Sequence, residues 1–243
     1  PLAVNFNPLA NTDDGTCLVC VGSITAPWTE NFDSYVVGST NFSGNGWYNE
    51  SALDNWDWTV DNLGTGSFGT GPGNDITIGG NYIYTETSGL GSNKTATVNS
   101  LCVNTTNLTT PNIRFSYHMF GATMGTLELV VDDVVVWSQS GNLGDQWLTA
   151  QIPLPSDSNV LIQFRGLTGT SFTSDMALDE LVVDDGVPAG CTDTLATNYN
   201  PTASVDDGSC TYVFGCTDPT AINYDSLATV DDGSCTVSYT HLT

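Results

Sequence analysis

The chain has 243 residues, and its 3 Lys and Arg against 27 Asp and Glu give a formal net charge of -24 at pH 7. A surface so poor in cations excludes sequence-independent binding to nucleic acid and disfavours binding to anionic membranes. Hydrophobic residues make up 40% of the chain, enough for a folded core, but no apolar stretch reaches the ~18 residues of a membrane helix, so we expect no membrane insertion.

The first segment, residues 1–19, ends in Asn-Thr-Asp-Asp-Gly-Thr-Cys17, which resembles the end of a motif that occurs in full twice toward the C-terminus. We interpret it as an acidic repeat that lacks its first Cys, and we therefore expect the chain to be part of a longer tandem array. Its candidate metal ligands are Asp13 and Asp14. Cys17 would be the remnant that makes the Cys count odd, at 7, a pattern that otherwise suggests a free thiol.

The central region, residues 20–186, is rich in Gly, Ser, Thr and Asn, and its apolar residues alternate over short runs. Alternation with a period of two predicts antiparallel strands with one buried face, here over 112–120, 126–131, 134–138, 147–154, 160–167 and 176–183. The second and third form a hairpin across Asp132-Asp133. Helical periodicity is essentially missing, so the region is predicted to be an all-β sandwich.

Short segments of this region resemble a MAM domain, and more closely the bacterial MAM-related domains of the Bacteroidetes type. They include Pro27-Trp-Thr-Glu-Asn-Phe-Asp33, Asp54-Asn-Trp-Asp-Trp58, Phe115-Ser-Tyr-His-Met-Phe-Gly121, Asp145-Gln-Trp147 and Asp175-Met-Ala-Leu-Asp-Glu-Leu181, in family order. The resemblance implies an antiparallel jelly-roll β-sandwich with an adhesive or accessory role outside the cell. The Cys positions differ from the animal pattern, so the animal disulfides are not carried over.

The same resemblance implies a structural calcium ion between early and late acidic residues, at the matching positions Asp33, Asp75 and Asp179. The alternative is that these residues cap turns by accepting backbone N–H groups.

The sequence contains no recognised catalytic motif, and we expect no enzymatic activity. His118 lies on a predicted regular strand, where an ordinary surface or core role is favoured. Arg114 and Arg165 would form one anion- or sugar-binding patch if their strands were neighbours, whereas the alternative is ion pairing with nearby acids. Trp28 and Trp47 are the tryptophans that we expect to be exposed for stacking on a ligand.

Two acidic repeats follow, residues 187–212 and 213–235. They align without a gap from Cys191 to Cys210 and from Cys216 to Cys235, 25 residues apart. Neither is large enough to bury much apolar surface, so each is predicted to be closed by its own disulfide in an oxidising compartment. Cys20 then pairs with Cys102, or alternatively with Cys17.

Each repeat concentrates the oxygen ligands that Ca²⁺ prefers. The disulfide would bring the Asp beside the first Cys close to the Asp-Asp-Gly that precedes the second. The alternative is that the Asp and Asn residues only stabilise turns. The candidate ligands are Asp193, Asn198, Asn200, Asp206 and Asp207 in one repeat, and Asp218, Asn223, Asp225, Asp231 and Asp232 in the other. The pattern is loosely similar to thrombospondin type 3 repeats.

The tail, residues 236–243, fits no repeat and resembles translated adapter sequence. Together these features predict a secreted or cell-surface adhesion or surface-fibre module with calcium-binding spacer repeats. Its expected partners are calcium and a glycan, another surface protein or copies of itself. The alternatives are a carbohydrate-binding accessory module of a larger secreted enzyme and a structural filament subunit.

Overall fold

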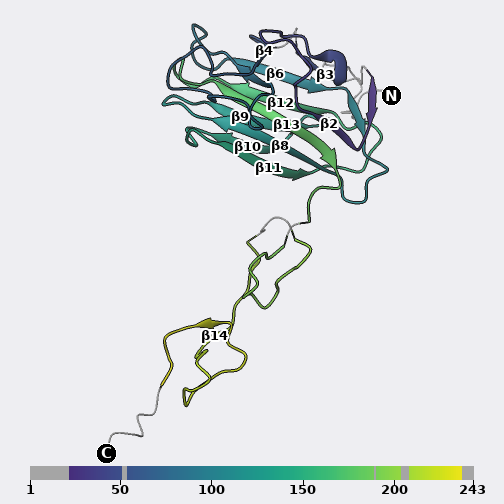
Figure 1. The fold of residues 1–243 in the computed structure, drawn as a ribbon. Helices are drawn as coiled ribbons and strands as arrows, with labels where there is room; N and C mark the ends of the chain where they lie inside the picture. The colour runs from purple at the N-terminus through teal and green to yellow at the C-terminus, as the bar shows by residue number, and fades with distance from the viewer. Residues whose placement is uncertain (1–21, 51–53, 189, 204–207, 237–243) are drawn as a thin grey trace, which may run out of the picture. The chain divides into compact units, whose positions relative to one another are not determined.

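The computed structural model describes residues 22–50, 54–188, 190–203 and 208–236. The chain divides into two compact units, residues 1–186 and 187–243. No helix in the described ranges is both long enough and apolar enough to cross a membrane. The elements (Figure 1) are β1 (Ser23–Thr25), β2 (Trp28–Glu30), the 3-10 helix η1 (Ser43–Asn45), β3 (Trp47–Asn49), β4 (Trp58–Asp61), β5 (Tyr82–Thr85), β6 (Thr95–Ser100), β7 (Cys102–Asn104), β8 (Asn112–Met119), β9 (Thr126–Val131), β10 (Val134–Ser140), β11 (Trp147–Pro153), β12 (Ile162–Leu167), β13 (Met176–Asp184), β14 (Phe214–Gly215) and β15 (Val230–Asp231).

The first unit is an antiparallel jelly-roll β-sandwich, as predicted. Its 5-stranded sheet has the order β10-β9-β12-β6-β3, and its 6-stranded sheet has the order β11-β8-β13-β5-β4 with β2 also paired to β13. The six strands predicted from alternation are β8 to β13, with ends that differ by at most two residues. Asp132 and Asp133 both have positive φ, of 48° and 67°, as a two-residue turn matched to the twist of a hairpin requires.

A chain of aromatic rings joins the inner faces of the two sheets. Trp47 stacks on Trp28 with ring centroids 5.3 Å apart and packs against Phe164 at 5.9 Å. Phe164 in turn meets Phe115 of the opposite sheet edge-on at 4.8 Å. The prediction that Trp28 and Trp47 are exposed is therefore wrong, because their side chains point into the sandwich and are only 8% and 0% exposed.

Strands β1 to β7 were not located from the sequence, and β5 shows why. All four of its residues are buried, so it lacks the alternation of a strand with one solvated face. Ile83 belongs to the core between the sheets. Tyr82 and Tyr84 form a second, smaller cluster with Ala177 and Trp147.

We expect truncation of a ring at the centre of this aromatic chain to destabilise the sandwich strongly. Replacement of the fully buried Trp47 by Ala should lower the free energy of unfolding by about 3–5 kcal/mol, through lost burial and the cavity left behind. Replacement of Val134, which is 61% exposed on β10, should change it by no more than about 0.5 kcal/mol. Urea unfolding followed by fluorescence checks both variants, and equal effects would contradict the assigned core.

Candidate metal centre

An irregularity in β13 creates the most distinctive polar site of the sandwich. On one side β13 pairs with β8, and the register shifts between Asp179 and Val182. On its other side β13 pairs with β5 at Ala177 and Leu178 and with β2 at Leu181 to Val183. Asp179 and Glu180 thus lie in the interval between two partner strands, and Glu180 takes a positive φ of 50°. The bulge re-aims side chains at this point, as β-bulges near functional sites do.

Asp75 reaches the same place from the loop that precedes β5. Its Oδ2 accepts hydrogen bonds from the backbone N–H of Thr77 at 3.2 Å and of Gly80 at 3.0 Å, and from the Thr77 hydroxyl. Asp33, which follows β2, accepts the Asn81 N–H on its Oδ1 at 2.7 Å. A side-chain carbon at Gly80 would lie 2.2 Å from Asp33 Oδ1 and 2.6 Å from Asp75 Oδ2. Only glycine leaves room for both carboxylates here.

Two buried oxygens at this site receive no hydrogen bond from the surrounding fold. Asp75 and Asp179 are 2% and 1% exposed, and neither Asp75 Oδ1 nor Asp179 Oδ2 accepts a hydrogen bond from a donor group of another residue. The remaining oxygen of Asp179 accepts the Glu180 N–H at 2.7 Å. A buried acceptor without a donor is costly, and two adjacent carboxylates can both ionise only if a cation lies between them.

The pKa values of the pair reflect this conflict. Burial, together with the neighbouring Asp75, raises the pKa of Asp179 to about 10. Burial alone would raise the pKa of Asp75, but hydrogen bonds from Asp179, Thr77 and Gly80 hold it below its ordinary value. Burial and the charges of Asp33 and Asp75 also raise the pKa of Glu180. The raised pKa of Asp179 favours a proton on this carboxyl beside the ionised Asp75, and a cation would take the place of that proton.

The donor atoms fit a hard cation such as Ca²⁺, which takes roughly six to eight oxygen ligands. Among the described residues, no three His, Cys, Asp or Glu side chains form a group arranged to hold a metal ion. Asp75 and Asp179 would therefore be two anchoring ligands, with the other oxygens supplied by backbone, hydroxyl groups or water. Asp33 is exposed, and its Oδ1 already accepts a hydrogen bond from Asn81. It is therefore a weaker candidate ligand than Asp75 and Asp179.

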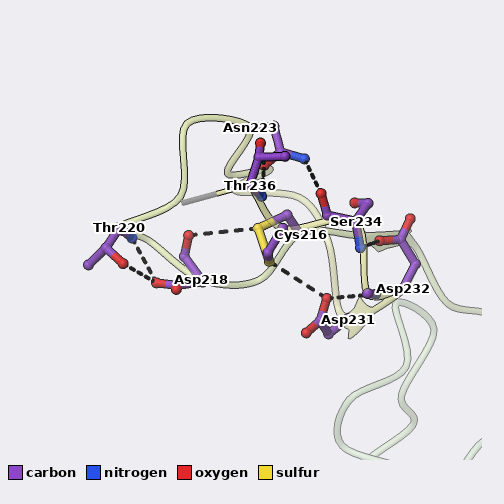
Figure 2. The surroundings of a disulfide bond; sticks show 10 residues. Cys216, Asp218, Thr220, Asn223, Asp231, Asp232, Ser234 and Thr236 are labelled. Atoms are coloured by element: carbon purple, nitrogen blue, oxygen red, sulfur yellow. Dashed lines mark hydrogen bonds between the residues drawn. A yellow bond between two sulfur atoms is a disulfide. The ribbon is translucent and has the colours of Figure 1, made fainter. Parts of the chain in front are cut away.

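The acidic residues of the last repeat are engaged in local turns. As Figure 2 shows, Asp218 accepts the N–H and hydroxyl of Thr220. Asp231 accepts the Gly233 N–H, and Asp232 accepts the Ser234 N–H. Hydrogen bonds from Thr220 and Ser234 lower the pKa values of Asp218 and Asp232 respectively. In this geometry the carboxylates stabilise turns, which is the alternative role considered for them.

The two repeats use an equivalent asparagine in the same way. Asn223 accepts the Thr236 N–H and donates to the Ser234 carbonyl. Asn198 makes the same two bonds, to Thr211 and Ser209. Asn200 and Asp225 accept the N–H groups of Thr202 and Leu227. Four of the predicted ligands, Asp13, Asp14, Asp206 and Asp207, lie outside the described residues.

The two predicted repeat disulfides are confirmed. Cys191 is bonded to Cys210 and Cys216 to Cys235, each pair 19 residues apart in sequence with a Cα–Cα distance of 4.8 Å. Cys102 is also disulfide-bonded. Its predicted partner, Cys20, lies outside the described residues.

Arg114 and Arg165 do not form one patch. Arg114 lies on β8 and Arg165 on β12, which belong to different sheets. Each forms its own ion pair at 2.6 Å, Arg114 with Asp184 and Arg165 with Glu128. Sequence reasoning left this outcome open as the alternative, and the shared anion-binding patch is excluded.

Sequence reasoning missed Glu180 and Gly80, which lie beside the buried pair of Asp75 and Asp179. The available signals were two adjacent acids, Asp179-Glu180, inside an otherwise apolar strand, and the Gly79-Gly80 pair after Asp75. Neither signal is specific, because the site forms only when β5 and β2 both pair with β13.

Comparison with known proteins places this domain in a family. The family model "MAM domain, meprin/A5/mu" matches residues 40–187. The MAM domain-containing glycosylphosphatidylinositol anchor protein 1 of Gallus gallus is 33% identical over 154 residues, which cover 56% of this chain and 16% of the relative. The MAM and fibronectin type III domain-containing protein 1 of Acropora millepora is 33% identical over 86 residues, covering 35% of this chain and 20% of the relative.

Among solved structures, the K2 cleaved adhesin domain of Lys-gingipain aligns with a TM-score of 0.47 and 15% identity, covering 64% of this chain and 98% of that one. The curated relatives are much longer proteins, of which this chain spans only a small part. The family match covers more than half of the chain and includes the bulged strand and both buried carboxylates, and the chain belongs to the MAM domain family.

Proposed function

We propose that the chain is a non-enzymatic extracellular adhesion module, in which a MAM sandwich holds a structural Ca²⁺ ion and the acidic repeats act as spacers. The observation that carries the cation is the pair of buried, unpartnered oxygens on Asp75 and Asp179. The family membership and the name of the anchored relatives support a position outside the cell. A glycosylphosphatidylinositol anchor retains a protein at a membrane without a spanning helix.

The surroundings of His118 support a non-catalytic role. Its Nε2 lies 3.2 Å from Asp145 Oδ1, and its Nδ1 is buried without a partner. No hydroxyl or thiol in the described ranges is bonded to this ring, as a nucleophile–base pair would require. Burial lowers the pKa of His118, despite the opposing effect of Asp145.

The spacer role is supported by the connection between the two described repeats. Tyr212, two residues after Cys210, donates its hydroxyl to Asp193 of the first repeat at 2.8 Å. The next residue, Val213, accepts the Thr229 N–H of the second repeat at 2.8 Å. Phe214 and Gly215 then pair with Val230 and Asp231. The connecting segment is therefore bonded first to one repeat and then to the other, which favours a stiff junction over a flexible linker.

Removal of one buried charge tests the Ca²⁺ site. With Ca²⁺ at about 100-fold above its Kd, wild-type stability should rise by about 2.7 kcal/mol over chelator. Asp179→Asn should abolish this gain, because the amide donates a hydrogen bond to Asp75 Oδ1 in place of the proton or cation. Its stability in chelator at pH 8 should equal or exceed that of the wild type. Calorimetry with and without Ca²⁺ checks this.

The matched control is Asp218→Asn plus Asp232→Asn in the last repeat, which should leave the gain unchanged. The prediction that the repeats themselves bind calcium is tested by the same series. If the gain survives Asp179→Asn and disappears in the repeat variant, the ion belongs to the repeats and the sandwich site is wrong.

The raised pKa of Asp179 predicts a pH dependence. A carboxyl whose pKa is higher in the folded chain binds more protons when folded, so its contribution to stability is lost as pH rises from the unfolded value toward about 10. Asp175, with a pKa raised by burial to about 6, acts in the same direction. His118, whose pKa is lowered by burial, acts in the opposite direction. The stability of the wild type relative to Asp179→Asn in chelator should therefore fall from pH 5 to pH 8, since both chains share His118, and the gain from Ca²⁺ should be larger at pH 8. A gain that is equal at both pH values would contradict competition between proton and cation.

The junction predicts coupled motion of the two repeats. ¹⁵N relaxation of the whole chain should give residues 191–203 and 216–235 the same rotational correlation time. Insertion of Gly-Gly-Ser between Tyr212 and Val213 should separate the two values, whereas Tyr199→Phe, at an exposed tyrosine within a repeat, should not. Independent tumbling of the wild-type repeats would contradict the stiff spacer.

A further inference from the structure

The loop between β4 and β5 exposes an aromatic ring that the fold does not use. Phe68, within Gly64-Thr-Gly-Ser-Phe-Gly-Thr-Gly-Pro-Gly73, is 98% exposed. Single exposed apolar residues are common on proteins, but a whole phenyl ring in water at a loop tip forgoes about 2 kcal/mol of burial. The Gly64–Gly73 loop thus holds the Phe68 ring in solvent, away from the core.

Hydrogen bonds fix the base of the loop, so the exposure of Phe68 does not result from a loosely held loop. The Thr65 hydroxyl donates to the Thr70 carbonyl at 2.9 Å. The Thr70 hydroxyl accepts the Asp175 N–H at 2.9 Å, and both of these residues are buried. The Gly71 N–H donates to the Phe120 carbonyl at 3.0 Å. Thr70 and Gly71 thus fix the loop after Phe68 to the residue that precedes β13 and the residue that follows β8, and Thr65, before Phe68, is bonded to Thr70.

A neighbouring loop exposes a second aromatic ring at the same end of the sandwich. Ser67 and Ser88 join their hydroxyls at 2.7 Å. The adjacent Thr87 donates its hydroxyl to the Phe172 carbonyl at 2.9 Å, and Phe172 is 50% exposed. The loops that carry Phe68 and Phe172 are thus both bonded to the Thr87-Ser88 segment. This places two exposed aromatic residues among hydroxyl-bearing side chains.

Beside Phe68 lies an open hollow of about 640 Å³, lined by the Gly64–Gly73 loop, Phe120 and Asp145. This volume suits a small ligand, since binding sites commonly measure roughly 300–1,000 Å³. Asp145, at its edge, is exposed and is held through Oδ1 by the buried His118. The glycine-rich wall offers backbone amide and carbonyl groups unobstructed by side chains.

The chemistry of the lining selects the class of ligand. No Lys or Arg lines the hollow, and the chain's two Arg are engaged in ion pairs elsewhere, so phosphate, sulfate and uronate groups lack a counter-charge. The rings are surrounded by Gly, Ser, Thr and Asp rather than by the contiguous apolar core typical of protein interfaces. The exposed ring of Phe68 suits a ligand with a flat C–H face that can stack on it. The carboxylate of Asp145 suits a ligand with hydroxyl groups that donate hydrogen bonds.

We propose that this hollow binds a neutral hexose unit of a glycan, with the sugar's C–H face stacked on Phe68 and its hydroxyls donating to Asp145 and to loop carbonyls. This rests on the proposed adhesive function and names the ligand class for it. The hollow and the Asp75–Asp179 pair share no residue, so glycan binding is tested separately from the metal site.

Affinity electrophoresis of the whole chain in native gels tests the proposal. The gels contain a soluble β-glucan, a mannan or a galactan as neutral probes, with alginate as anionic and chitosan as cationic comparison. Retardation is expected in at least one neutral gel and not in alginate. Phe68→Ala should weaken it at least tenfold and Asp145→Asn several-fold. Phe68→Trp should retain it, and the exposed-residue control Val134→Ala should leave it unchanged.

Unchanged thermal unfolding of Phe68→Ala would show that the variant is folded, as expected for a side chain that contacts little. Retardation by a neutral glycan that persists undiminished in Phe68→Ala and Asp145→Asn would overturn this site while leaving an adhesive function in place. Binding to chitosan alone, abolished by salt, would show a cationic ligand and overturn the neutral-sugar assignment. No retardation in any gel would overturn the glycan proposal, and the Ca²⁺ response would remain a separate test of the module.

Discussion

The bulge in β13 is the constraint on which the polar architecture of the sandwich depends. β13 is the central strand of its sheet and pairs with β8 on one side and with both β5 and β2 on the other. Relative to β8, β13 has one extra residue between Asp179 and Val182, where its pairing on the other side passes from β5 to β2. The loop before β5 brings Asp75 to this gap, and Asp33 follows β2. The buried pair of Asp75 and Asp179 therefore lies where β13 departs from regular pairing.

The two units are stabilised by different interactions. The sandwich relies on burial, with aromatic rings linking the inner faces of its sheets. The repeats bury little apolar surface: Ile222 and Leu227 are both 74% exposed, and Tyr199 is 41% exposed. Their order comes from a disulfide and from side-chain oxygens that accept nearby backbone N–H groups, as small disulfide-closed modules require. This difference explains why the repeats contain so many Asp and Asn residues whether or not a metal ion binds them.

The parts of the structure that depend on local sequence were predictable, and those that depend on distant pairing were not. Strands β8 and β12 alternate apolar and polar residues along most of their length, which locates them. β5 is buried on both faces and β2 and β3 have three residues each, so periodicity carries no information there. The prediction that Trp28 and Trp47 are exposed failed because three residues are too few to show which face of the strand points toward the core.

The same distinction applies to the sites. The repeat disulfides lie within one motif and follow from its spacing. Asp75 and Asp179 are more than a hundred residues apart, and the resemblance to MAM domains, rather than local sequence, suggested that they meet. That their inner oxygens lack partners could be seen only from the folded chain.

The position of the disulfides has a mechanical consequence for any tension applied along the repeats. Each bond joins residues 19 apart in sequence across a Cα–Cα distance of 4.8 Å, so a pulling force passes through the sulfur atoms and bypasses the loop between them. Reduction of one bond would release about 60 Å of additional contour, since an extended residue spans about 3.4 Å. In an oxidising medium the repeats transmit tension at nearly constant length, whereas a reducing one would turn each of them into an extensible element.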